Sequence, residues 1–349
     1  MREMYAHWSG VLRLWVSDSA LASWLSGAAT RFSRANNGVY IQVSVVSEQT
    51  LRAFSYAAAT PPDILVFPAG FLESGDGLLP VECPDEVSSS LASCGQNLAV
   101  PIALNGYACA YHPSKIKSAL EGAELLLPTD GAGHSASAAL IALLTGNPEN
   151  AAEDETPIRY GMDFGLPTPT PIARKAASGR REIRLSGASL RTEDALTRFM
   201  RDEAAATLVC AQEIASLRAL DDSGRGSDWE ILFSGEAFTD RIALFGIVNG
   251  ERADQDERTE MCEKFLETLL SDDVQRSLSA IKRFRVTVGE ALYAGQRGYG
   301  ELEAILSGVN LSVPPAFGSG WRKRAAEYAD ALLRGESGAQ EMWKALWDS

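Results

Sequence analysis

The sequence has no long uninterrupted apolar run. No stretch of the 349 residues approaches the roughly 20 consecutive apolar residues that span a bilayer. The opening segment, MREMYAHWSGVLRLWV (1–16), has neither the apolar core nor the small-residue cleavage site of an export signal. We therefore expect either a cytosolic protein or a protein whose export signal is absent from this chain.

Residues that hold metals or perform catalysis are also scarce. The three histidines, His7, His112 and His134, are scattered, and no Cys-x-x-Cys spacing occurs. No Gly-x-Ser-x-Gly motif is present, and no sequence pattern places a histidine beside a reactive cysteine. We expect no metal, no cofactor and no enzymatic activity.

The five cysteines cannot all pair within the chain. Cys83 and Cys94 bracket a loop short enough for a disulfide, and we expect them to be bridged in oxidised protein. Cys109, Cys210 and Cys262 lie in apolar contexts that are typical of buried thiols.

Positive charge is scarce relative to negative charge, and the formal net charge is −14. This balance argues against a nucleic-acid partner, because phosphate binding needs a concentrated basic surface. The densest basic cluster, Arg322-Lys323-Arg324, falls in a predicted helix and is interpreted as a solvated face. A hydrophobic content of 46% is typical of a soluble globular protein. The length exceeds what one compact core usually contains, so we expect two lobes.

The N-terminal part of the chain alternates between strand and helix patterns. Strands are predicted at 11–16, 39–46 and 64–67, and helices from Asp18 or Ser19 to the stop at 36–38 and over about 50–59. This order predicts an α/β lobe with right-handed crossovers.

The rest of the chain contains further predicted elements. They are a buried helix (136–146), long surface connections (147–187), a helix followed by a strand (207–211), a strand (238–248), a long amphipathic helix with a break at 271–273, and two closing helices (321–333 and 339–347). The Gly-rich loop at 129–135 lacks the Lys-Ser/Thr ending of a phosphate loop and is interpreted as a turn.

A polar tripeptide interrupts the apolar segment VPIALNGYACAYHP (100–113). Asn105, Gly106 and Tyr107 need either buried hydrogen-bond partners or an open surface. We favour a functional role, in which Asn105 and Tyr107 face a ligand and Gly106 tolerates dihedral changes.

Several segments, in this order, resemble the extracellular solute-binding proteins of ABC importers, the family that includes maltose-binding protein. They are DILVFPAGFLE (63–73), VPIALNGYACAYHPSKI (100–116), FMRDEAAATLVCAQEI (199–214), EKFLETLLSDDVQRSL (263–278) and GWRKRAAEYADALLRGESGAQEMWKAL (320–346). The resemblance covers nearly the whole chain, with departures. Asp202 replaces a usual Gly, Ala206 replaces a usual Met, and the family's Thr-Trp-x-Glu motif is absent.

The resemblance implies a two-lobe periplasmic-binding-protein-like α/β fold. Each lobe would be a mainly parallel sheet flanked by helices, and hinge crossovers would join the lobes. The implied N-terminal lobe comprises 10–106 and 238–284. The implied C-terminal lobe comprises 107–237 and 285–349, with the ligand cleft between the two.

The resemblance also implies a function. The chain would capture a small organic solute, with a sugar or oligosaccharide preferred, by hinge closure, and deliver it to the transmembrane permease of an ABC importer. It would act outside the cytoplasm, in the periplasm or at the cell surface, as a monomer.

By analogy with the family, ligand contacts come from the carboxyl ends of strands. The candidate ligand-binding residues are Ser17, Asp18, Glu48, Phe71, Asn105, Tyr107, Gln212, Glu213, Trp229 and Trp321.

Most of these candidates have an alternative role. Ser17 and Asp18 would serve as helix caps, and Glu48 as a solvated side chain. The three aromatic candidates other than Tyr107 would pack in the core, and the pair at 212–213 would belong to a surface loop.

Other functions stay open at this point. A cytosolic ligand-sensing or regulatory domain of the same fold would also lack an export signal. A carrier of a non-sugar solute is a second alternative, although the adjacent tyrosines of similar iron carriers are missing. An enzyme on the same scaffold is a third.

Overall fold

The computed structural model describes residues 8–54, 61–114, 125–127, 183–185, 192–203, 206–224, 228–231, 237–250, 252–307, 311–318, 320–321 and 324. The chain forms two compact units. Unit 1 consists of Met1–Leu104, Ile242–Glu290 and Pro315–Gly318, and unit 2 of Asn105–Arg241, Ala291–Pro314 and Ser319–Ser349.

The described sheet of unit 1 has five strands. In spatial order they are β2 (Val39–Val45), β1 (Gly10–Val16), β3 (Ile64–Pro68), β11 (Ile242–Ile247) and β4 (Val100–Leu104). The pairs β1–β2 and β1–β3 are parallel, whereas β11 runs antiparallel to both β3 and β4. The sheet is therefore mixed, not mainly parallel as expected, because β11 re-enters the unit from residue 241 and inserts between two strands of the opposite direction.

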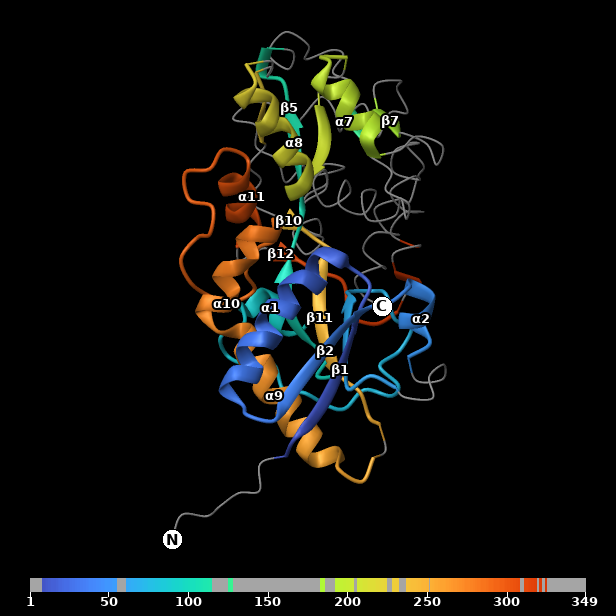
Figure 1. The fold of residues 1–349 in the computed structure, drawn as a ribbon. Helices are drawn as coiled ribbons and strands as arrows, with labels where there is room; N and C mark the ends of the chain where they lie inside the picture. The colour runs from blue at the N-terminus through green and yellow to red at the C-terminus, as the bar shows by residue number, and fades with distance from the viewer. Residues whose placement is uncertain are drawn as a thin grey trace. The chain divides into compact units, whose positions relative to one another are not determined.

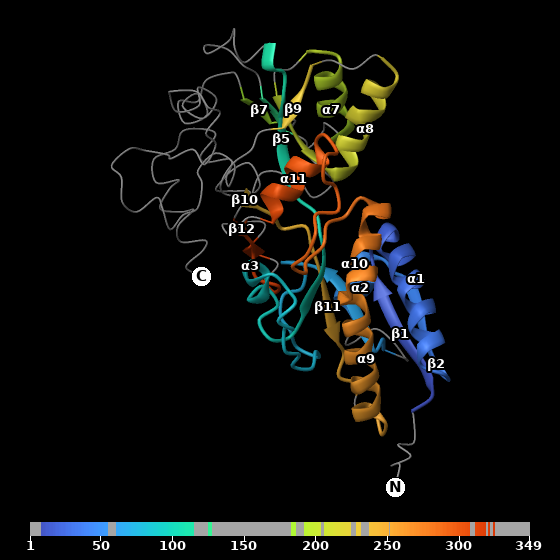
Figure 2. The same ribbon diagram turned by 90° about the vertical axis from the view of Figure 1, so that its left-hand side faces the viewer.

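Two long helices of unit 1, α1 (Ser19–Ala35) and α9 (Gln255–Leu270), lie side by side along its sheet (Figures 1 and 2). Phe32 of α1 meets Phe265 of α9 edge to face, with ring centroids 5.4 Å apart, and Phe245 of β11 lies 6.3 Å from Phe265. All three rings are buried. These contacts join the helices and the sheet in one core.

The predicted helix break at 271–273 is confirmed. Helix α9 ends at Leu270, α10 (Asp272–Arg276) begins after the extended residue Ser271, and a 3₁₀ turn (Ser277–Ile281) follows. The buried side chain of Gln275 donates to the carbonyls of Ile102 and Leu269 (3.0 and 2.9 Å) and accepts from the Val286 N–H (3.0 Å). This amide ties α10 to β4.

Unit 2 contains a second mixed sheet. Its described strands, in spatial order, are β7 (Ile183–Leu185), β6 (Leu125–Leu127), β8 (Ala206–Cys210), β5 (Tyr107–Tyr111) and β9 (Glu230–Ile231). The pairs β6–β7 and β6–β8 are parallel, and β5 is antiparallel to β8 and β9. Strand β8 confirms the strand predicted at 207–211, shifted by one residue.

The remaining described elements are short connections and flanking helices. They are α2 (Glu48–Arg52), α3 (Ser89–Ala92), α7 (Thr192–Met200), α8 (Ala211–Asp222), α11 (Tyr299–Leu306) and the paired strands β10 (Ala237–Phe238) and β12 (Leu311–Ser312). The predicted helix at 136–146, the loop at 129–135, nearly all of the 147–187 connection and most of the two closing helices lie outside the described residues.

The expected Cys83–Cys94 disulfide is wrong for this structure, in which both residues are free thiols. Cys94 is buried, whereas Cys83 is half-buried and its sulfur faces the Pro84 carbonyl. Burial raises the pKa of the Cys94 thiol to about 12. Short spacing along the sequence did not bring the two sulfurs into a bond.

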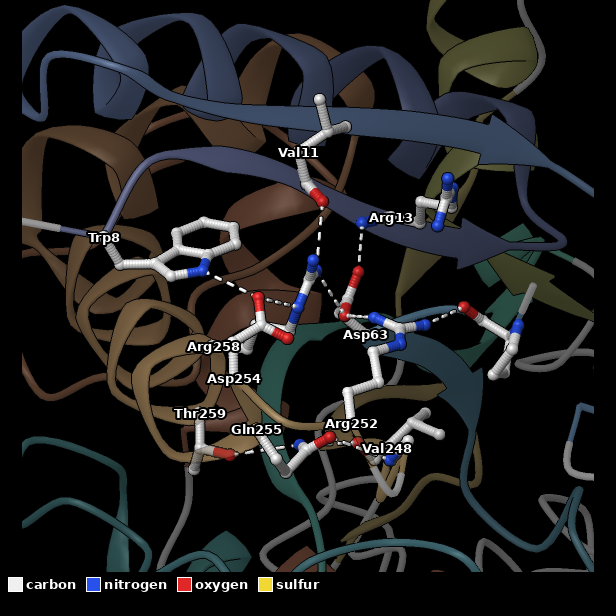
Figure 3. Close-up of polar contacts among 12 residues, drawn as sticks. Trp8, Val11, Arg13, Asp63, Val248, Arg252, Asp254, Gln255, Arg258 and Thr259 are labelled. Carbon is white, nitrogen blue, oxygen red and sulfur yellow. Dashed lines mark hydrogen bonds and ion pairs between the residues drawn. The ribbon is translucent and has the colours of Figure 1, made fainter.

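An ion network centred on the buried carboxylate of Asp63 lies at the amino end of β3 (Figure 3). The Asp63 side chain, which is 5% exposed, pairs through Oδ1 with Arg252 and with Arg258 Nη1 (3.0 Å), and its Oδ2 accepts from the Arg13 N–H (2.7 Å). Arg258 also donates to Asp254 (2.9 Å), which accepts from Trp8 Nε1 (2.9 Å). The network joins β1, β3 and the start of α9.

Candidate functional site

Asp18 follows β1 and caps the helix after it. Its Oδ1 accepts from the N–H groups of Ala20 (2.8 Å) and Leu21 (3.2 Å), which are otherwise unpaired at the helix start. Its Oδ2 pairs with Arg283 Nη2 at 2.7 Å. The capping role is thus observed, and the half-buried Ser17 stands between β1 and this cap.

The carboxyl ends of β2 and β3 carry Glu48 and Phe71. Glu48 is exposed at the first position of α2, where a negative charge suits the helix dipole. Phe71 is only 3% exposed. The guanidinium of Arg52, at the last position of α2, lies 3.9 Å above its ring and donates to the Phe71 carbonyl. Sequence reasoning missed Arg52.

Asn105, the first residue of unit 2, is buried with all of its polar groups paired. It is 2% exposed. Its Nδ2 donates to Gln212 Oε1 (3.0 Å) and its Oδ1 accepts from the Gly106 N–H (2.9 Å). Its carbonyl accepts from Thr239 Oγ1 (2.6 Å), and its N–H donates to the Arg241 carbonyl (2.8 Å). Buried partners, not an open surface, satisfy this part of the polar interruption.

Tyr107 is held by Arg241. Its ring is 3% exposed, the guanidinium of Arg241 lies 4.5 Å from the ring centroid, and Nε donates to the phenol oxygen. Gly106, between Asn105 and Tyr107, leaves little room for a side chain, because a Cβ there would lie 2.5 Å from Leu306 Cδ2 of α11. Sequence reasoning missed both the arginine and this close approach. The polar stretch Thr239–Arg241 before β11 was the available signal.

Gln212 and Glu213 meet this group because β8 ends beside the start of β5, where Tyr107 pairs with Cys210. Gln212 Oε1 also accepts from the Cys210 thiol (3.2 Å), and Glu213 Oε2 accepts from the Cys210 N–H (2.6 Å), capping α8. Burial raises the pKa of Cys210 to about 11, and the Glu213 carboxylate adds to the rise. The thiol is therefore protonated at neutral pH and serves as a donor.

The predicted tryptophans are buried. Trp229 donates to both oxygens of Asp221 (3.1 and 2.9 Å), and the guanidinium of Arg297 covers its ring at 4.4 Å. Gly298 also approaches the ring, since a Cβ there would lie 3.0 Å from it. Trp229 is thus packed in the core of unit 2. Trp321 is 2% exposed.

The structure therefore groups the predicted residues in two places. Four of them lie at the carboxyl ends of β1, β2 and β3 in unit 1, the strand-end site: Ser17, Asp18, Glu48 and Phe71. Four others belong to a polar cluster at the start of β5 and α8, the unit 2 cluster, together with three residues that were not predicted: Asn105, Tyr107, Gln212 and Glu213, with Cys210, Thr239 and Arg241.

No group of three or more potential metal ligands occurs among the residues that the structure describes. Within the same residues, no helix combines the length and the apolar character needed to cross a membrane.

No protein-family model matches the chain, and no curated protein matches its sequence. Solved structures do match its fold. A probable secreted solute-binding lipoprotein from Streptomyces coelicolor is 16% identical, with a TM-score of 0.64, over 97% of this chain and 98% of that one. The maltodextrin-binding protein MalE1 from L. casei BL23 is 14% identical, with a TM-score of 0.63, over 98% and 97%.

The GacH receptor of Streptomyces glaucescens, solved unliganded and with acarbose, is also similar. It is 14% identical, with a TM-score of 0.59, over 98% of this chain and 97% of that one. The chain thus has the fold of the two-lobe solute-binding proteins, with mixed α/β sheets. The resemblance seen in the sequence segments is confirmed at the level of the fold.

Proposed function

We propose that this chain binds a small organic solute, with a sugar or oligosaccharide preferred, and delivers it to the permease of an ABC importer. One observation supports this most strongly: the fold matches solute-binding proteins over 97–98% of the chain. Two of those proteins are described as a receptor solved with acarbose and a maltodextrin-binding protein. Binding, not catalysis, is the activity we propose.

In the mechanism we propose, the two sets of polar residues supply the contacts that a sugar needs. Carboxylates and amides bind hydroxyl groups, and aromatic rings pack against C–H faces. Unit 1 would contribute its strand-end site. Unit 2 would contribute Gln212, which is exposed, and Glu213, which is half-buried. The buried side chains of Asn105, Tyr107, Trp229 and Trp321 would support this surface from below. Ligand binding would favour a closed arrangement of the hinge, because a ligand shifts an equilibrium toward the state that it binds better.

The proposal extends to the setting of the protein. A monomer that works outside the cytoplasm, at the cell surface or in the periplasm, fits this role. The secreted lipoprotein among the similar structures supports such a location.

A thermal-shift screen tests the proposed function. The panel should contain neutral and acidic sugars, oligosaccharides, amino acids, polyamines and inorganic anions. A ligand at 100 times its Kd raises the unfolding free energy by about 2.7 kcal/mol. We expect sugars to raise the melting temperature most. No shift with any sugar, but a shift with another class, would overturn the preference for a sugar, and no shift with any compound would count against solute binding.

A further inference from the structure

Arg52 occupies an unusual position at the carboxyl end of the unit 1 sheet. It ends α2, which follows β2, and its side chain is exposed. Two contacts fix its guanidinium: the ring of Phe71 lies 3.9 Å below it, and one Nη donates to the Phe71 carbonyl. Phe71 follows β3, so the segments after two strands that flank β1 in the sheet together hold the cation in place.

This cation has no carboxylate partner among the residues that the structure describes. Within the same residues, the guanidinium contacts only Phe71, through its ring and through its carbonyl. Glu48 lies one turn earlier on the same helix, at the spacing that permits an ion pair, but it does not pair with Arg52. Among the described residues, nothing occupies Nε and the other Nη, and in our proposal these donors bind a ligand.

A planar guanidinium held over an aromatic ring is suited to binding a carboxylate. Its parallel N–H donors match the two oxygens of a carboxylate, and charge-assisted pairs of this geometry are about twice as strong as neutral hydrogen bonds. Because stacking on Phe71 already orders the side chain, binding loses less conformational entropy.

We propose that Arg52 is a specificity-determining residue that binds the carboxylate of an acidic sugar, such as a uronic acid. This inference rests on the proposed function and narrows its substrate class from sugars in general to sugars that carry a carboxylate. The expected ligand therefore bears a negative charge, although the protein itself has a net charge of −14. Phe71 acts as the support for Arg52, not as an open stacking platform.

Calorimetric titration of the full chain with paired probes tests this inference. The pairs are galactose with galacturonate, glucose with glucuronate, and galactobiose with digalacturonate. We expect the acidic member of at least one pair to bind more tightly than its neutral partner. Arg52→Gln should lower the affinity for that acidic member by at least about tenfold and leave the neutral one within about twofold. Arg52→Lys, which keeps the charge but not the planar donors, should fall between.

Arg34→Gln is the matched control. Arg34 is exposed in the last turn of α1, and its substitution changes the net charge equally. Arg34→Gln should leave the affinities for the acidic and the neutral probe unchanged. If it lowers the affinity for the acidic probe as much as Arg52→Gln does, the effect comes from net charge alone and the inference is wrong. The inference would be overturned if wild type binds neutral sugars as tightly as acidic ones and Arg52→Gln binds both as wild type does. The proposed function would still stand. If Arg52→Gln loses affinity equally for the acidic and the neutral probe and also melts at a lower temperature, Arg52 has only a structural role, and the inference is overturned. No binding of any of the six probes would overturn the inference, and the wider thermal-shift panel would then decide whether the proposed function stands.

Discussion

Arginines at the two ends of the unit 1 sheet differ in burial and in ion pairing. At the amino end of β3, Arg252 and Arg258 are mostly buried and share the carboxylate of Asp63 (Figure 3). At the carboxyl ends of β2 and β3, Arg52 is exposed and rests on Phe71. The partly buried arginines that share a carboxylate contribute to the fold, whereas the exposed Arg52 should contribute little to it and, in our proposal, binds a ligand.

The comparison predicts its largest effect at Asp63. Asp63→Asn keeps the shape of the side chain but removes the ion-pair partner of Arg252 and leaves Arg258 with Asp254 alone. Breaking a buried ion pair costs about 3–5 kcal/mol, and the partial exposure of the two guanidinium groups places the expected loss at the lower end of that range. We expect a clearly lower urea midpoint, followed by the circular dichroism of the full chain. Asp85→Asn, an exposed change of the same charge in the same unit, is the control. Equal midpoints for the two variants would contradict the structural reading of the network.

The unit 2 cluster should show an intermediate effect, because it is buried but its central amide is uncharged. Asn105→Ala leaves the Gly106 N–H without its acceptor and removes the donor to Gln212. Unsatisfied buried groups cost about 1–3 kcal/mol. Denaturation curves should show a loss in that range, and a smaller loss is expected for Gln212→Ala, which removes the acceptor of the Asn105 Nδ2 group but keeps the bond to the Gly106 N–H. If both variants match wild type, the cluster is not held by these hydrogen bonds.

Asp254 should contribute less than Asp63 to the stability of the fold, and its contribution should depend on pH. Hydrogen bonds from Arg258 and from Trp8 hold the pKa of Asp254 below its ordinary value of 3.8. The folded state then binds the proton less readily than the unfolded state. The stabilisation is therefore present above pH 3.8 and is lost as the pH falls further, through the lowered folded-state pKa.

Urea midpoints at pH 6 and pH 3 measure this contribution. We expect Asp254→Asn to fall below wild type at pH 6 and to approach it at pH 3. A difference that stays constant, or grows at pH 3, would have the wrong sign for a lowered carboxylate pKa.

Local sequence patterns predicted much of the fold. Strand alternation, the cap at Asp18 and the break at 271–273 are encoded within a few residues, and each is present in the structure. The antiparallel insertion of β11 was not predicted, because strand order depends on contacts between distant segments. The Cys83–Cys94 expectation failed for a related reason, since spacing alone does not define where two side chains point.

The candidate site residues also fall into those that the sequence indicated and those that depend on contacts between distant segments. The interruption at 105–107 and the strand end at 212–213 were visible in the sequence, and the pairing of Tyr107 with Cys210 brings them together. Their arginine partners were not visible. Arg241 is 134 positions from Tyr107, and Arg252 is 189 positions from Asp63. Sequence alone gave no reason to choose these arginines among the others.

Substituting Arg52 should have the smallest effect on stability. A small effect is what the contrast between the arginines at the two ends of the sheet requires. Arg52→Gln loses one cation–π contact and one hydrogen bond at an exposed position, which should cost less than about 1 kcal/mol. Its urea midpoint should therefore lie close to that of Arg34→Gln and far above that of Asp63→Asn. A loss as large as that of Asp63→Asn would mean that the guanidinium holds the β2 and β3 ends together, and the contrast between the two ends of the sheet would disappear. A small loss, with affinity for an acidic sugar reduced in the same variant, would separate ligand recognition from folding at a single side chain.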